Sequence, residues 1–311
     1  MKKFVIKSIF FFGIIAFGVV AINKWTPKNK NLSNYIAAII DKHKRLEQIQ
    51  TPKIIFAGGS NLAFGLDSEK IENKFSIPIV NLGLHAGLGL SFMLEELKYS
   101  VKKGDVVFIS PEYFLEEEGD YRLKKKTSGF YKPAALFYDK NSVDDFNLFI
   151  ENSEINLKNI FDSKKIKKDF KIYSRESFNE YGDVVGHLKS NETKKLNDKS
   201  IFKYRYWEGI NLINNFNEFA KKKNISVYFL YPDFLDSEYY KNKTVLDKLQ
   251  IDLEKNLEIK IINSPNDFIF EKSFFFDTVY HLNKKGRNER TKKMIKIIEN
   301  YIPKNPKSKT T

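Results

Sequence analysis

The order of short apolar runs and amphipathic segments most constrains the fold of this chain. Five runs are short and apolar, as buried strands are, and they cover residues 53–57, 78–82, 105–110, 225–232 and 257–264. Segments with helical periodicity alternate with them, at 66–75, 89–103, 204–224, 236–256 and 284–301. Strands that alternate with helices predict a parallel sheet with both faces covered. We therefore expect an α/β fold with a doubly wound, five-stranded parallel sheet.

The alternation stops between residues 115 and 200. This stretch mixes charge runs with aromatic and polar residues and has no clear period. We interpret it as a central insertion of helix and loop, built over one edge of the sheet. The α/β domain is then expected to cover residues 51–303, with a polar tail at 304–311.

The N-terminus has the composition of a membrane segment. Lys2, Lys3 and Lys7 accompany an apolar stretch, 4–22, that is close to the ~20 residues needed to cross a bilayer. We expect residues 1–25 to be an uncleaved single-pass anchor that leaves the bulk of the chain outside the cytoplasm. The alternative is a signal peptide cleaved near Val19 and Ala21. Lysines at 24, 28 and 30 follow the stretch, so positive charge flanks both of its ends. Residues 26–50 are expected to form a helical linker.

Composition excludes some classes of function and leaves others open. The 311-residue chain has no cysteine, which excludes disulfides and thiolate metal sites. Its formal net charge is +14, but the lysines are scattered and no nucleic-acid-binding motif is present. We therefore expect no nucleic-acid partner, and a lysine-rich surface suited to an anionic polymer of the cell envelope instead. No cofactor and no metal are expected.

The residues at the carboxyl ends of the strands are the first candidates for a site, because ligands of open α/β sheets bind there. At the first exit, "AGGSN", Gly58 and Gly59 allow a sharp turn into Ser60. Taken alone, Ser60 is a helix-capping residue. Taken with the other exits, it is a candidate nucleophile. Gly83 follows the second strand, either as a turn residue or as an N–H donor to an oxyanion.

The remaining exits supply carboxylates and an imidazole. Glu112 and Tyr113 follow the third strand and form a candidate substrate-orienting pair. Asp277 and His281 precede the last helix, and an Asp four residues before a His can fix the tautomer of the imidazole. This makes the two residues a candidate acid–base pair.

Asp183 and His187 repeat the same spacing within the predicted insertion. A second acid–base pair and a metal-ligand fragment are possible readings, but no third ligand is evident. A polar loop that lines the cleft and contacts substrate is the reading we favour.

Together, these exits resemble the SGNH (GDSL-like) hydrolase superfamily over residues 53–114 and 225–301. The resemblance rests on "AGGSN" with Ser60, "NLGL" with Gly83, and "DTVYHLNKKG" with Asp277 and His281. There are three departures. "GGSN" replaces G-D-S, "SPEYF" replaces the block that carries an oxyanion-hole asparagine, and the acid–base pair is one residue longer than D-x-x-H.

The resemblance implies a flavodoxin-like sheet and serine chemistry on acyl esters. Ser60 would be the nucleophile, His281 the base and Asp277 its partner. Ser60 and Gly83 would supply oxyanion donors, with Asn61 as a substitute third donor. The departures are similar to those of the membrane-anchored branch that modifies envelope polymers, such as the alginate O-acetylation proteins. This branch implies an esterase or an O-acyltransferase on an envelope glycan, the latter with a membrane-bound acyltransferase as a partner. The alternative is an inactive protein of the same fold, used for carbohydrate binding or complex assembly.

Overall fold

The computed structural model describes residues 1–25, 31–161, 172–189, 196 and 201–302. The chain divides into two compact units. Unit 1 consists of Met1–Asn31 and Asp139–Asp169, and unit 2 consists of Leu32–Tyr138 and Phe170–Thr311. The predicted polar tail, 304–311, lies outside the described residues.

Unit 2 is built on a five-stranded sheet in the order β2-β1-β3-β4-β6, with every neighbouring pair parallel. The strands are β1 (Ile54–Gly58), β2 (Ile79–Asn81), β3 (Val106–Ser110), β4 (Ser226–Phe229) and β6 (Lys260–Ile261). Strands β1 and β3 are buried at every residue, as expected for a parallel sheet covered on both faces. The predicted α/β class and the five parallel strands are confirmed.

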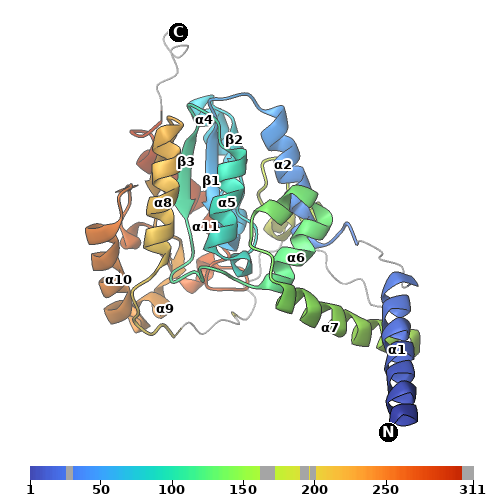
Figure 1. The fold of residues 1–311 in the computed structure, drawn as a ribbon. Coiled ribbons are helices and arrows are strands. Elements are labelled where there is room, and N and C mark those ends of the chain that lie inside the picture. Colours follow the sequence, from blue (N-terminus) through green and yellow to red (C-terminus); the bar gives the residue numbers. More distant parts are fainter. Residues whose placement is uncertain (26–30, 162–171, 190–195, 197–200, 303–311) are drawn as a thin grey trace. The chain divides into compact units, whose positions relative to one another are not determined.

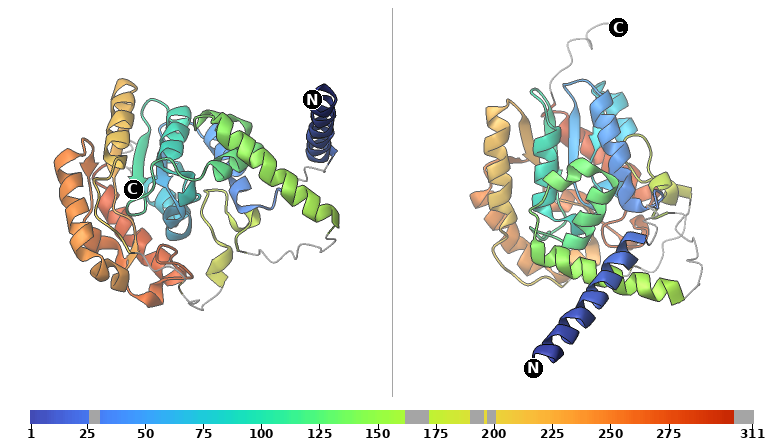
Figure 2. Two further views of the ribbon diagram at one scale, coloured as in Figure 1. Left: turned by 60° about the horizontal axis from the view of Figure 1, so that its bottom comes forward. Right: turned by 45° about the vertical axis from the view of Figure 1, so that its right-hand side comes forward.

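Helices lie on both faces of this sheet (Figures 1 and 2). Helices α5 (Leu90–Ser100) and α8 (Gly209–Lys222) contact each other on one face, and α11 (Lys284–Ile298) lies on the other with α3 (Ser60–Gly65) and α4 (Ser68–Phe75). Helices α9 (Asp236–Lys241) and α10 (Lys243–Asn256) belong to the connection from β4 to β6. Gly104 has a left-handed backbone (φ 89°) in the turn between α5 and β3.

A second, two-stranded parallel sheet was not predicted. It pairs β5 (Phe234–Leu235) with β7 (Ile269–Phe270). Strands of two residues are too short to show a period of two in the sequence. Several 3₁₀ helices were also not predicted: η1 (Tyr35–Ala38), η2 (Ala86–Leu88), η3 (Lys132–Leu136), η4 (Arg175–Ser177), η5 (Gly186–Lys189), η6 (Pro265–Phe268) and η7 (Lys272–Phe274).

The segments at 26–50 and 115–200 contribute to unit 2 in three places. Helix α2 (Ile39–Gln48) contacts β2, and the buried Lys42 on it donates to the carbonyls of Asn81 (2.8 Å) and Gly182 (2.6 Å). Helix α6 (Tyr121–Phe130) and the stretch 172–189 also belong to unit 2. Residues 139–169 belong to unit 1 instead.

Unit 1 contains two helices that contact each other, α1 (Lys2–Trp25) and α7 (Ser142–Phe161). Within α1, the 20 residues Lys2–Ala21 are long and apolar enough to cross a membrane. They are not buried by the rest of the protein. The predicted N-terminal apolar helix is confirmed.

Candidate active site

The first strand exit places Ser60 at the start of a helix. Strand β1 ends at Gly58, and α3 begins at Ser60 after one extended residue, Gly59. A Cβ atom on Gly59 would lie 2.2 Å from Oε2 of Glu112, so any larger residue there would displace this carboxyl group. The glycine before the serine thus lets the third strand exit approach the first.

Helix α3 also carries Phe64, which contacts His281. The ring of Phe64 stacks on the imidazole of His281, with centroids 3.9 Å apart and an angle of 6°. Residues 60 and 64 are four apart, so they lie on one face of a helix, one turn from each other. Ser60 is thus about one helical turn from the aromatic ring that holds the imidazole.

His281 and Asp277 are paired. Nδ1 of His281 lies 2.9 Å from Oδ1 of Asp277, and both side chains are almost fully buried. Thr278 closes a tight turn between the two residues, since its hydroxyl accepts the N–H groups of Tyr280 (3.2 Å) and His281 (3.1 Å).

Tyr173 is a further member of this cluster that the sequence did not indicate. Its hydroxyl donates a hydrogen bond to Oδ2 of Asp277 and lies 3.2 Å from Nδ1 of His281. Its ring also lies near those of Tyr35 and Phe64, with centroids 5.9 and 5.8 Å away. Tyr173 is separated from Asp277 by 104 residues and comes from a stretch with no periodicity, so no local pattern could reveal it.

Glu112 lies directly beside Ser60. Its Oε1 accepts the N–H of Asn61 (3.1 Å) and lies 3.5 Å from Oγ of Ser60, the long limit of a hydrogen bond. Its Oε2 is buried without a partner in the described part of the chain. Burial raises the pKa of Glu112, and the Asn61 N–H and the charges of His281 and Arg290 oppose this rise.

The three predicted oxyanion donors differ in whether they are already hydrogen bonded within the protein. The N–H of Gly83 donates to Oδ1 of Asn81 (2.9 Å), and the Nδ2 of Asn61 donates to the carbonyl of Ser110 (3.1 Å). Both donors are thus engaged within the protein. For the backbone N–H of Ser60, no acceptor is found among the described residues. The structure therefore leaves one of the three donors open.

Arg290 of α11 is hydrogen bonded to the first turn of α3. It is fully buried, donates to the carbonyl of Asn61 (2.7 Å) and forms an ion pair with the equally buried Asp233 (2.5 Å). Burial raises the pKa of Asp233 to about 7. This pair joins the segment after β4 to the turn that carries Ser60, and sequence reasoning did not indicate it.

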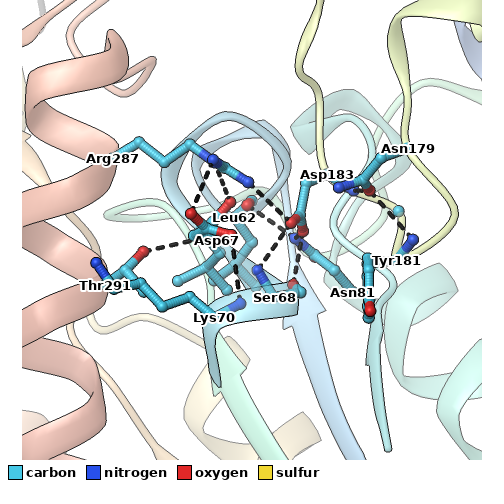
Figure 3. Close-up of polar contacts among 12 residues, drawn as sticks. Leu62, Asp67, Ser68, Lys70, Asn81, Asn179, Tyr181, Asp183, Arg287 and Thr291 are labelled. Atoms are coloured by element: carbon cyan, nitrogen blue, oxygen red, sulfur yellow. Dashed lines mark hydrogen bonds and ion pairs between the residues drawn. The ribbon is translucent and has the colours of Figure 1, made fainter. Parts of the chain in front are cut away.

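Asp183 lies in the interior, in a polar network shown in Figure 3. Its carboxylate accepts the N–H (2.8 Å) and the hydroxyl (2.6 Å) of Ser68, the amide of Asn81 (2.9 Å) and the guanidinium of Arg287 (3.2 Å). Four donors saturate the carboxylate, and the side chain has no exposed surface. Its contacts are those of a structural residue that fixes the turn after α3 and the end of β2.

His187 is also buried and does not pair with Asp183. Its Nε2 lies 2.9 Å from the carbonyl of Leu282, and its ring contacts those of Phe64 and Phe276. Burial lowers the pKa of His187 to about 4. A neutral imidazole that donates to a backbone carbonyl accounts for this position, next to the segment that carries His281.

Tyr113 packs in the core and does not line the site with its hydroxyl. It is 7% exposed and its ring lies against Phe234, with centroids 5.3 Å apart. Its backbone N–H donates to the hydroxyl of Tyr280 (3.1 Å). Tyr113 thereby connects the exit of β3 to the turn that holds Asp277 and His281.

No model of a protein family matches this chain, and no curated protein matches it. The function is therefore inferred from the geometry of the site alone.

Proposed function

We propose that the protein is a membrane-anchored serine acyl-ester hydrolase or O-acyltransferase of the SGNH type that acts on a cell-envelope glycan. One observation carries the proposal: Phe64 stacks on the Asp277-paired His281 one helical turn from Ser60. A nucleophile, a base and a group that orients the base are the parts of a serine triad. The strand order β2-β1-β3-β4-β6 and the location of these residues at strand exits support the same assignment.

The proposed reaction has two halves. His281 takes the proton of the Ser60 hydroxyl as its oxygen attacks the carbonyl of an ester, and Asp277 stabilises the imidazolium. The tetrahedral oxyanion is stabilised by the Ser60 N–H. When it collapses, the leaving alcohol takes the proton from His281. Water or a sugar hydroxyl then attacks the acyl-enzyme by the reverse sequence, which gives hydrolysis or transfer.

Glu112 is the residue we assign to the position left by the missing oxyanion asparagine. Its carboxyl group follows β3 and faces Ser60 and Asn61, and burial raises its pKa. A neutral carboxyl group is a hydrogen-bond donor, as an amide is. In this proposal Glu112 orients the serine and donates to the substrate oxygen.

The location proposed for the site is the outer face of the membrane. Helix α1 supplies the anchor, and the lysine-rich surface suits an anionic envelope polymer. If the reaction is transfer, the acyl group must come from a donor, and a membrane-bound acyltransferase is the expected partner.

A second candidate function is an inactive SGNH-fold protein that binds carbohydrate or assembles a complex. Two observations favour it. The Gly83 N–H is engaged by Asn81, and the hydroxyl of Ser60 faces Glu112, with no hydrogen bond from Ser60 to His281 among the described residues.

Labelling with a fluorophosphonate probe separates the two functions, because the probe reacts with activated serines. We expect the full-length protein to be labelled, and the Ser60→Ala and His281→Ala variants not to be. Circular dichroism controls for folding of both variants. A folded wild-type protein that is neither labelled nor active on acyl esters would establish the inactive alternative.

A further inference from the structure

Helix α7 of unit 1 has an apolar stripe that no described residue covers. Val143, Phe146, Ile150 and Leu157 follow one another at intervals of three, four and seven residues, which places them on one face of the helix. Phe146 is 63% exposed and Ile150 is 40% exposed. Large exposed apolar side chains in a row are the mark of an interaction surface.

The opposite side of α7 is polar and acidic. Asp145, Glu151 and Asn152 lie there, and the helix has no lysine or arginine between Ser142 and Leu157. The exposed Ile155 lies on this side as well. The helix is thus amphipathic, with an acidic polar face.

The partner of the stripe is indicated by the other helix of unit 1. Helix α7 contacts α1, and residues Lys2–Ala21 of α1 have the length and composition of a membrane span. A helix that contacts a membrane span is held beside the bilayer. Its uncovered apolar face then has lipid as its nearest apolar surroundings.

We propose that α7 lies along the membrane surface, with the stripe of Val143, Phe146, Ile150 and Leu157 turned toward the acyl chains. Helices of this kind place their apolar face about 5–10 Å into the boundary between headgroups and acyl chains. The acidic residues exclude a second crossing of the bilayer, because carboxylates are costly in its centre. The lack of basic residues between Ser142 and Leu157 predicts association with zwitterionic lipid that does not depend on anionic headgroups. The inference does not rest on the proposed enzymatic function.

The absence of native cysteine allows a direct test. Single variants Phe146→Cys, Ile150→Cys and Asn152→Cys of the full-length chain are labelled with a nitroxide in phosphatidylcholine nanodiscs. Asn152 is the matched control, because it lies two residues after Ile150 and about 200° further around the same helix. Paramagnetic resonance then measures collisions of each label with oxygen, which concentrates in lipid, and with a water-soluble nickel complex.

We expect labels at 146 and 150 to collide at least several-fold more with oxygen than with the nickel complex, and the label at 152 to show the reverse. Equal access of the nickel complex to all three positions would place the stripe in water and overturn the proposal. Labels at 146 and 150 that are shielded from both reagents would also overturn it, in favour of a protein surface as the partner.

Discussion

Two Asp–His pairs in this molecule have the same four-residue spacing but different hydrogen-bond partners. Asp277 and His281 are hydrogen bonded to each other at 2.9 Å, whereas Asp183 is bonded to Ser68, Asn81 and Arg287, and His187 to the carbonyl of Leu282. Both imidazoles lie against Phe64, at 3.9 and 4.9 Å between ring centroids. The two pairs are thus neighbours in space with different partners.

The difference comes from the backbone and from the surrounding donors, since the spacing is the same. Between 277 and 281, Thr278 closes a turn that brings the two side chains together. In the second pair, the carboxylate of Asp183 accepts hydrogen bonds from four donors on other elements and does not bond the imidazole of His187. Only in the first pair does the carboxylate bond the imidazole, as the proposed triad requires.

The largest expected effect is on catalysis by the first pair. Asp277→Asn should lower kcat on an acyl ester by about 10⁴-fold, because the amide no longer fixes the tautomer of His281 or stabilises its charged form. The measurement is ester turnover by full-length protein, with thermal unfolding as the control for folding. An unchanged kcat in a folded variant would remove Asp277 from the proposed triad.

For the second pair, the expected effect of a substitution is on the free energy of unfolding. Asp183→Ala removes one of the two carboxylates that pair with the buried Arg287 and one of the two acceptors of the Asn81 amide. Breaking a buried ion pair costs up to about 3–5 kcal/mol. Denaturant unfolding measures the loss. The matched control is Asp247→Ala, which breaks the exposed pair with Lys243 (2.7 Å) and should change the unfolding free energy little. Equal effects of the two variants would show that the network in Figure 3 is not a stabilising element.

A third prediction concerns pH. The pKa of His187 is about 4 in the folded protein and about 6.5 when unfolded, so only the unfolded state binds a proton between these values. Stability is therefore complete above pH 6.5 and falls as the pH drops toward 4. Relative to His187→Gln, the wild type should lose about 2 kcal/mol of unfolding free energy between pH 7.5 and pH 5. Parallel pH curves for the two proteins would show that burial of His187 is not linked to folding.

The sheet could be predicted from the sequence because each of its strands is a separate apolar run. The candidate residues at the strand ends could be predicted because ligands of parallel sheets bind at the carboxyl ends of the strands. The sequence could not indicate β5 and β7, which have two residues each, or the division of 115–200 between the units. Within the site, Asp183 and Asp277 have the same local pattern, so their partners were not predictable from spacing. Those partners come from residues up to 115 positions away.

The contribution of Tyr173 is the smallest effect expected and the most specific. Its hydroxyl bonds Oδ2 of Asp277, which leaves Oδ1 to face Nδ1 of His281. A hydrogen bond to a charged group is worth about 1.5–3 kcal/mol. Only the part of this energy that is gained between the ground state and the transition state affects kcat. Tyr173→Phe keeps the ring, so we expect kcat to fall about tenfold, which corresponds to about 1.4 kcal/mol, with KM unchanged.

Tyr35→Phe is the matched control for this variant. The two rings are neighbours, at 5.9 Å between centroids, but the hydroxyl of Tyr35 donates to the carbonyl of Leu84 (2.8 Å). Loss of that hydroxyl should lower stability and leave kcat within twofold, on the order of the scatter of such comparisons. If both variants lower kcat equally, the effect belongs to the packing of the aromatic cluster. If only Tyr173→Phe lowers kcat, the orientation of Asp277 depends on a residue that lies outside the strand exits. The two pairs would then differ in one respect: Asp277 accepts a hydrogen bond from such a residue and still bonds its histidine, whereas Asp183 does not bond His187.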